Sequence, residues 1–156
     1  MNNKMGKEEI ISLLIPLGIG FISGLISMGG IKNFNSLIKP FLSPPGFIFP
    51  IVWTILYILM GISSYLIYNE NDYYSSFSLK IYALNLFVNF LWSPLFFGLG
   101  LRLFSFIWIV VLDIVVSYMI YNFYKVNKKA AYLQIPYLVW CIYATYLNLA
   151  FYLLNR

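Results

Sequence analysis

The chain has 156 residues, of which 62% are hydrophobic and only 10% are charged. This composition excludes both an ordinary soluble domain and a disordered chain. The net charge of +5 comes from basic residues that are scattered among connections and tails rather than gathered in one patch, so no nucleic-acid partner is expected.

Five long apolar stretches fill nearly all of the chain. The hydrocarbon core of a bilayer is ~30 Å thick and a helix rises ~1.5 Å per residue, so about 20 apolar residues cross it. Backbone amides inside lipid must be paired internally, which favours helices. The sequence therefore predicts an all-α integral membrane protein, a single bundle of five transmembrane helices. The predicted spans are Ile10–Ile31, Phe47–Tyr68, Ile81–Leu101, Leu103–Tyr124 and Ala130–Asn155.

The connections are short, and their lysines and arginines give the orientation. Six basic residues fall on the side of the amino terminus and four on the other, which favours an amino terminus in the cytoplasm. The first connection contains Pro40, Pro44 and Pro45. Because proline forbids a continuing helix and restricts the residue before it, we expect a fairly rigid strap at the membrane surface.

Three of the predicted spans carry stripes that mix aromatic and hydrogen-bonding side chains at helical spacing. These stripes are Trp53, Tyr57, Met60 and Ser64; Asn85, Asn89, Trp92 and Phe96; and Pro136, Trp140, Ala144 and Asn148. Two interpretations remain open. Tryptophans near helix ends often belong to the interfacial belt, and asparagines often pair across helices; alternatively, both contact a ligand.

Asp113 is the one carboxylate inside a predicted span. A carboxylate near the bilayer centre costs about 2.5–3.5 kcal/mol on insertion scales, so Asp113 should face protein or a wet cavity. The chain has no histidine, which removes His-based triads, His-ligated zinc and conventional His-ligated haem. We therefore expect no intrinsic metal site and no obligatory cofactor.

Three motifs resemble those of one membrane family, the TspO/translocator proteins, also called tryptophan-rich sensory proteins or peripheral-type benzodiazepine receptors. The similar segments are Pro44–Tyr57 with Gly61–Tyr65, Asn85–Phe97, and Pro136–Trp140 with Ala144–Asn148. Their order and spacing agree over essentially the whole chain. Many members carry tryptophan where this chain has Leu42, Phe47 and Tyr152.

The resemblance implies a five-helix bundle, commonly a homodimer, with a cavity that opens toward the first connection and binds porphyrin, haem or other hydrophobic ligands. It implies cavity-lining roles for Trp53, Asn89, Trp92, Trp140 and Ala144, with Asp113 as a wall residue. The stripes add Tyr57, Asn85 and Asn148 to the expected ligand-binding residues, since a flat macrocycle needs aromatic faces and a few polar groups.

Three kinds of function remain open from the sequence. The first is capture of a tetrapyrrole for transport or regulation, which we favour because no general acid–base pair is visible. The second is an enzyme-like, light- and oxygen-dependent breakdown of bound porphyrin, in which Trp53 and Trp140 would stabilise or relay a radical. The third is a stress sensor that acts through a partner protein.

Overall fold

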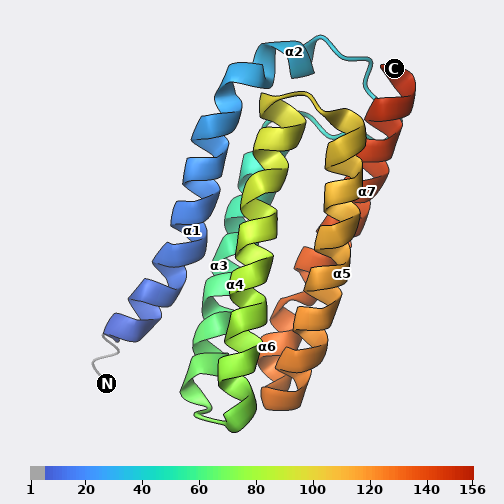
Figure 1. Cartoon of the computed structure of the whole chain (residues 1–156). Coiled ribbons are helices and arrows are strands. Elements are labelled where there is room, and N and C mark those ends of the chain that lie inside the picture. The colour runs from blue at the N-terminus through green and yellow to red at the C-terminus, as the bar shows by residue number, and fades with distance from the viewer. Residues whose placement is uncertain (1–5) are drawn as a thin grey trace.

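The computed structural model describes residues 6–156 and consists of helices that run alongside one another (Figure 1). Five helical segments are long and apolar enough to cross a membrane. The predicted all-α fold of five membrane-spanning helices is therefore confirmed. The elements in chain order are α1 (Lys7–Ser27), η1 (Met28–Gly30), α2 (Ile31–Asn35), α3 (Ile48–Asn69), α4 (Tyr73–Ser93), η2 (Pro94–Gly98), α5 (Arg102–Val126), α6 (Lys128–Leu133) and α7 (Ile135–Leu154).

The helices form a closed ring rather than a flat layer. Helix α1 packs against α3 and α4, α4 packs against α5, α5 packs against α6 and α7, and α3 packs against α6. The start of α1, the α3–α4 turn and α6 lie at one end of the bundle, whereas α2 and the carboxyl terminus lie at the other (Figure 1). Buried side chains of α3, α4, α5 and α7 form the interior of the bundle.

The third span begins earlier than predicted. Helix α4 starts at Tyr73 rather than Ile81, because Asp72 and Ser75 form a capping box at its amino-terminal end. The Asp72 amide donates to the Ser75 hydroxyl at 3.2 Å. The polar residues 73–80 therefore belong to α4, although the hydropathy pattern predicted that they form a connection. At the other end, Pro94 starts a wider π turn, in which the Leu99 amide donates to the Pro94 carbonyl at 2.8 Å.

The fifth span is divided in two, where a single helix over Ala130–Asn155 was predicted. Helix α6 ends at Leu133 and α7 begins at Ile135, with Gln134 between them. Pro136 lies in the first turn of α7 and has no amide hydrogen to continue the helical ladder. The first span also bends: its last turns pass through the 3₁₀ segment η1 into α2.

The first connection is fastened to α7 by side-chain hydrogen bonds. The Tyr146 hydroxyl donates to the Phe41 carbonyl at 2.7 Å, and the Tyr143 hydroxyl donates to the Leu42 carbonyl. Nearer the end of the chain, Asn155 Nδ2 donates to the Ile38 carbonyl at 3.0 Å. These bonds hold the connection over the end of the bundle.

Candidate functional site

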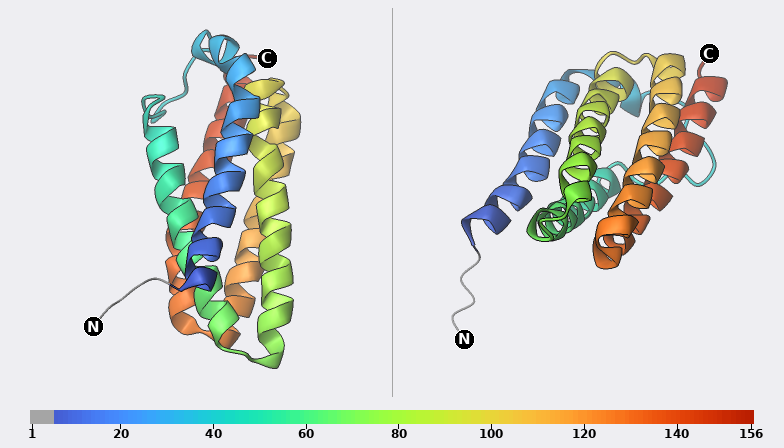
Figure 2. Two further views of the ribbon diagram at one scale, coloured as in Figure 1. Left: turned by 90° about the vertical axis from the view of Figure 1, so that its left-hand side faces the viewer. Right: turned by 60° about the horizontal axis from the view of Figure 1, so that its bottom comes forward.

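A cavity of about 780 Å³ lies between α1, α3 and α4, close to α2. It exists because α1 and α3 touch in their lower halves and separate toward α2 (Figure 2). Glycine permits the close contact. A Cβ atom on Gly61 would lie 2.8 Å from the Cα atom of Leu13, and one on Gly20 would lie 2.2 Å from the Tyr57 ring. Beyond Tyr57 the two helices diverge, and the cavity begins there.

Aromatic rings form the inner wall of this cavity. The ring centroids of Trp53 and Trp92 lie 5.8 Å apart, and those of Trp53 and Tyr57 lie 5.6 Å apart in a stacked arrangement. Phe97 continues the wall, with its centroid 5.9 Å from that of Trp92, and Phe49 lies 6.1 Å from Phe97. These rings provide a broad, rigid apolar surface to which a flat ligand can stack.

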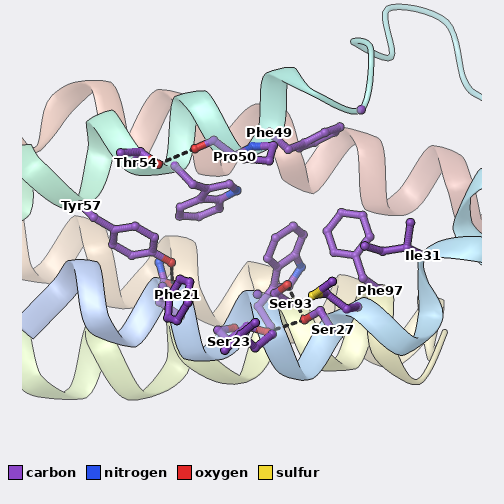
Figure 3. A pocket seen from close by; sticks show the side chains of 18 of the residues that line it. Phe21, Ser23, Ser27, Ile31, Phe49, Pro50, Thr54, Tyr57, Ser93 and Phe97 are labelled. Atoms are coloured by element: carbon purple, nitrogen blue, oxygen red, sulfur yellow. Dashed lines mark hydrogen bonds between the residues drawn. The ribbon is translucent and has the colours of Figure 1, made fainter.

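The polar atoms of the cavity are few and are mostly engaged with one another (Figure 3). The Tyr57 hydroxyl donates to Asn89 Oδ1 at 2.8 Å, and the Ser27 and Ser93 hydroxyls are 2.8 Å apart. The Ser23 hydroxyl donates to the Phe90 carbonyl, also at 2.8 Å. Within the described part of the chain, no charged side chain lines the cavity. The site therefore suits an apolar body with a small number of polar edges.

The cavity reaches the lateral surface of the bundle, between α1 and α3. Three of its lining residues, Phe21 and Leu25 on α1 and Met28 at the start of η1, are more than half exposed. Pro50 and Thr54 on α3 are exposed on the opposite rim. This opening lies along two of the segments that are long and apolar enough to span a membrane.

Four of the residues expected in a ligand site line this cavity together: Trp53, Tyr57, Asn89 and Trp92. They come from the stripes on α3 and α4. Trp53 is half-buried, whereas the other three side chains are buried. The two stripes meet because α3 and α4 pack against each other.

The structure places the other five expected residues outside the cavity wall. Asn85 is fully buried and accepts a hydrogen bond from the Tyr137 hydroxyl at 2.7 Å. Asn148 accepts from Trp92 Nε1 at 3.2 Å and thereby supports a cavity residue from behind. Ala144 is buried in the core. Trp140 lies behind Phe49, with ring centroids 5.9 Å apart.

Asp113 lies on the far side of the bundle, at the contact between α5 and α7. Its Oδ2 atom accepts a hydrogen bond from the Thr145 hydroxyl at 2.6 Å. Its Oδ1 atom is buried and has no hydrogen-bond partner among residues 6–156. The expectation that this carboxyl group faces protein agrees with the structure, but it contributes nothing to the cavity wall.

Sequence reasoning overlooked the wall that α1 provides. Gly20, Ser23, Gly24 and Ser27 of α1 line the cavity together with the larger Phe21 and Met28. The small residues recur at spacings of three and four, which places them on one face of the helix. That spacing was the available signal, because a helix face made of small residues leaves room for either a neighbouring helix or a ligand.

The fold and the cavity define the class of the molecule: it is a multi-pass α-helical membrane protein with an aromatic cavity that opens between α1 and α3. Within residues 6–156 no group of three or more metal-ligating side chains is brought together. Comparison with known sequences then identifies the family. The family model described as TspO/MBR matches residues 12–153.

Individual relatives agree with the family model. The chain is 38% identical over 148 residues to the tryptophan-rich protein TspO of Archaeoglobus fulgidus, which covers 94% of this chain and 95% of that protein. It is 35% identical over 157 residues to the protein of the same name from Chlorobaculum tepidum, covering 95% and 98%. It is 34% identical over 139 residues to the translocator protein of Sus scrofa, covering 86% and 82%. The chain belongs to the TspO/MBR family.

Proposed function

We propose that the protein binds a tetrapyrrole, a porphyrin or haem, in the cavity between α1, α3 and α4, and acts in its transport or regulation. The observation that carries this proposal is the aromatic wall of Trp53, Trp92 and Phe97 in a cavity of about 780 Å³. That volume lies within the ~300–1,000 Å³ range of small-molecule sites. We place the protein in a bacterial cytoplasmic membrane.

The distribution of charge supports a ligand with an apolar centre and acidic edges. The cavity wall itself is uncharged, yet Lys32 on α2 and Lys39 on the strap are exposed near the end of the bundle where the cavity lies. A porphyrin could place its ring against the indoles and direct its carboxylates toward these lysines. The same arrangement would accept other hydrophobic ligands that carry an acidic edge.

A titration with protoporphyrin tests the proposal. Purified protein in lipid nanodiscs would be titrated in the dark while tryptophan quenching and the porphyrin absorption band are followed. Stacking contributes on the order of 1 kcal/mol beyond burial, so Trp53→Phe should weaken binding several-fold. Trp108→Phe is the matched control, because the Trp108 indole donates to the Val88 carbonyl at 2.7 Å and does not line the cavity. Equal affinities for both variants would contradict the assignment of the site.

A second candidate function is light- and oxygen-dependent breakdown of the bound porphyrin. It is favoured by the direct contact between Trp53 and Trp92, which places two oxidisable indoles in the cavity wall. The test is illumination of the complex in air, compared with an equal amount of porphyrin in empty nanodiscs. If conversion does not exceed that of the lipid-bound porphyrin alone, the protein acts as a carrier or sensor.

A further inference from the structure

A second group of buried polar side chains lies in the half of the bundle away from α2. It consists of Ser78, Tyr82 and Asn85 on α4, and Gln134 at the break between α6 and α7. Gln134 and Asn85 are fully buried. Among residues 6–156, no hydrogen-bond partner is found for Ser78 Oγ, Tyr82 Oη, Asn85 Nδ2 or either amide atom of Gln134. We call these four side chains the polar core cluster.

The four side chains lie at similar depths in the same half of the bundle. Ser78, Tyr82 and Asn85 recur at spacings of four and three and therefore lie on one face of α4. The Asn85 side chain bonds to Tyr137, one turn after Gln134. Helices α4 and α7 start from the same end of the bundle and run in the same direction (Figure 1). Tyr82 precedes Asn85 by one helical turn, and Gln134 precedes Tyr137 by one turn. Tyr82 and Gln134 therefore lie at about the same level along the bundle axis.

Neighbouring residues close this region on its other sides. Ser64 of α3 is buried, and its hydroxyl donates to the Gly61 carbonyl at 3.0 Å. The Phe123 ring of α5 lies 6.3 Å from the Tyr82 ring, centroid to centroid. Phe123 is fully buried. The polar core cluster thus sits inside the helical ring and is shielded from lipid.

A continuous chain of hydrogen bonds joins the polar core cluster to the ligand cavity. The Tyr57 hydroxyl in the cavity wall donates to Asn89 Oδ1 at 2.8 Å, and Asn89 Nδ2 donates to the Tyr137 hydroxyl at 2.7 Å. The Tyr137 hydroxyl donates in turn to Asn85 Oδ1 at 2.7 Å. The chain therefore ends at Asn85, which belongs to the polar core cluster and whose Nδ2 donor has no partner among the described residues.

Buried polar groups are almost always paired, and a membrane-embedded bundle offers no bulk solvent to pair them. A glutamine amide alone supplies two donors and two acceptor sites. The polar core cluster contains uncharged donors and acceptors together and no carboxylate, which suits water better than a cation, since water both donates and accepts. Buried waters commonly make about three hydrogen bonds to such groups.

We propose that ordered water molecules occupy the polar core cluster, bound by Gln134, Asn85, Tyr82 and Ser78. These waters extend the hydrogen-bonded chain from the ligand cavity toward the end of the bundle formed by α6. The site is distinct from the ligand cavity, because Tyr57, Asn89 and Tyr137 separate the two, and it does not depend on the identity of the ligand.

Radiolytic hydroxyl-radical labelling tests the proposal directly, because water bound inside a protein is converted to radicals that modify its neighbours. Phe123 and Phe151 form a matched pair: both are fully buried phenylalanines. Phe123 lies against Tyr82, whereas Phe151 packs against Phe34 and Phe96. The unliganded wild-type protein in nanodiscs should show Tyr82 and Phe123 labelled several-fold faster than Phe151. Equally slow labelling of Phe123 and Phe151 overturns the proposal.

The substitution Gln134→Met gives a second, independent test. Methionine has a similar length and flexibility but no amide. If water pairs the Gln134 amide, the variant loses those bonds, so its melting temperature falls and labelling of Phe123 slows. If no water pairs the Gln134 amide in the wild-type protein, the substitution removes the cost of an unpaired buried amide. The melting temperature of Gln134→Met would then be unchanged or higher, and that result would overturn the proposal. Asn148→Leu is the control, because Trp92 and the Ala144 carbonyl already pair that amide. It should leave labelling of Phe123 unchanged.

Discussion

Trp53 on α3 and Trp92 on α4 are in direct contact, with ring centroids 5.8 Å apart and planes inclined at 36°. Trp92 is held from behind by Asn148 of α7, which accepts its indole N–H at 3.2 Å. Asn148, a buried residue of α7, thus fixes the orientation of a ring that α4 presents to the cavity. We expect this wall to keep its shape whether or not a ligand is bound.

The contact between α1 and α3 should depend on Gly61. A methyl group there would meet the backbone of Ser12 and Leu13 at 2.8 Å, so Gly61→Ala must push the helices apart. Overpacking of this kind costs about 1–3 kcal/mol. We expect a lower melting temperature in detergent. Gly18→Ala is the control, since nothing lies within 4 Å of the added atom. Equal melting temperatures for the two variants would contradict the close contact.

The lysines near α2 should distinguish porphyrins that carry carboxylates from those that do not. Exposed ion pairs are worth ~0.2–1 kcal/mol each, so Lys32→Ala with Lys39→Ala should weaken protoporphyrin binding by a few-fold at low salt. Binding of the dimethyl ester should not change. Replacing Lys128 and Lys129, at the opposite end of the bundle, gives the same change in net charge and should leave both affinities intact. An equal loss for acid and ester would rule out the proposed orientation.

Metal-free porphyrin should bind about as tightly as haem. The chain has no histidine, and Cys141 is buried in α7 away from the cavity lining. Met28 and Tyr57 do line the cavity but are weaker candidates for iron. Parallel titrations with protoporphyrin and haem check this expectation. A large preference for haem that disappears in Met28→Leu would show that ligation of iron contributes.

Binding and photochemistry should separate in Trp140→Phe. Trp140 does not line the cavity but touches Phe49, which does, and its ring lies 5.3 Å from Tyr143. Binding should therefore stay near the wild-type value. If Trp140 relays a radical, light-dependent conversion should fall sharply, because phenylalanine oxidises less readily than tryptophan. Full conversion in both Trp53→Phe and Trp140→Phe would refute the radical role.

The two ends of the bundle should label from opposite sides of the membrane. Cysteines would be introduced at Ser43, on the strap, and at Lys129, in α6, in a Cys141→Ser background. Impermeant maleimide added to intact cells should reach Ser43→Cys and not Lys129→Cys, because the excess of basic residues on the side of the amino terminus, where Lys129 lies, favours a cytoplasmic location for that side. Reaction of both sites, or of Lys129→Cys alone, would contradict the proposed orientation.

The sequence was sufficient for the five spans, because the length of an apolar run is a direct consequence of bilayer thickness. It was less informative at the ends of the helices. Asp72 and Ser75 extend α4 through a capping box, a local interaction that hydropathy does not measure. The break at Gln134 depends on a single missing amide hydrogen, that of Pro136.

The candidate site was predictable only where helix faces were unambiguous. Tyr57 follows Trp53 by four residues and Trp92 follows Asn89 by three, so each pair stays on one face. The stripe on α7 was longer, and residues spaced by four drift around a helix: Trp140 and Asn148 differ by ~80° at 3.6 residues per turn. One face therefore could not hold them all. Asp113 lies on α5, which does not border the cavity. The spacing of residues along a single helix does not reveal which helices will pack around a cavity.

The lateral opening between α1 and α3 changes what an affinity for this protein means. For a ligand that enters through this opening from the bilayer, the concentration that governs occupancy is its mole fraction in lipid rather than its amount per litre of buffer. Adding empty membrane to a sample would dilute the ligand without changing the total volume, and the apparent Kd would rise in proportion. Values measured in detergent micelles and in vesicles become comparable only when each is divided by the amount of apolar phase present.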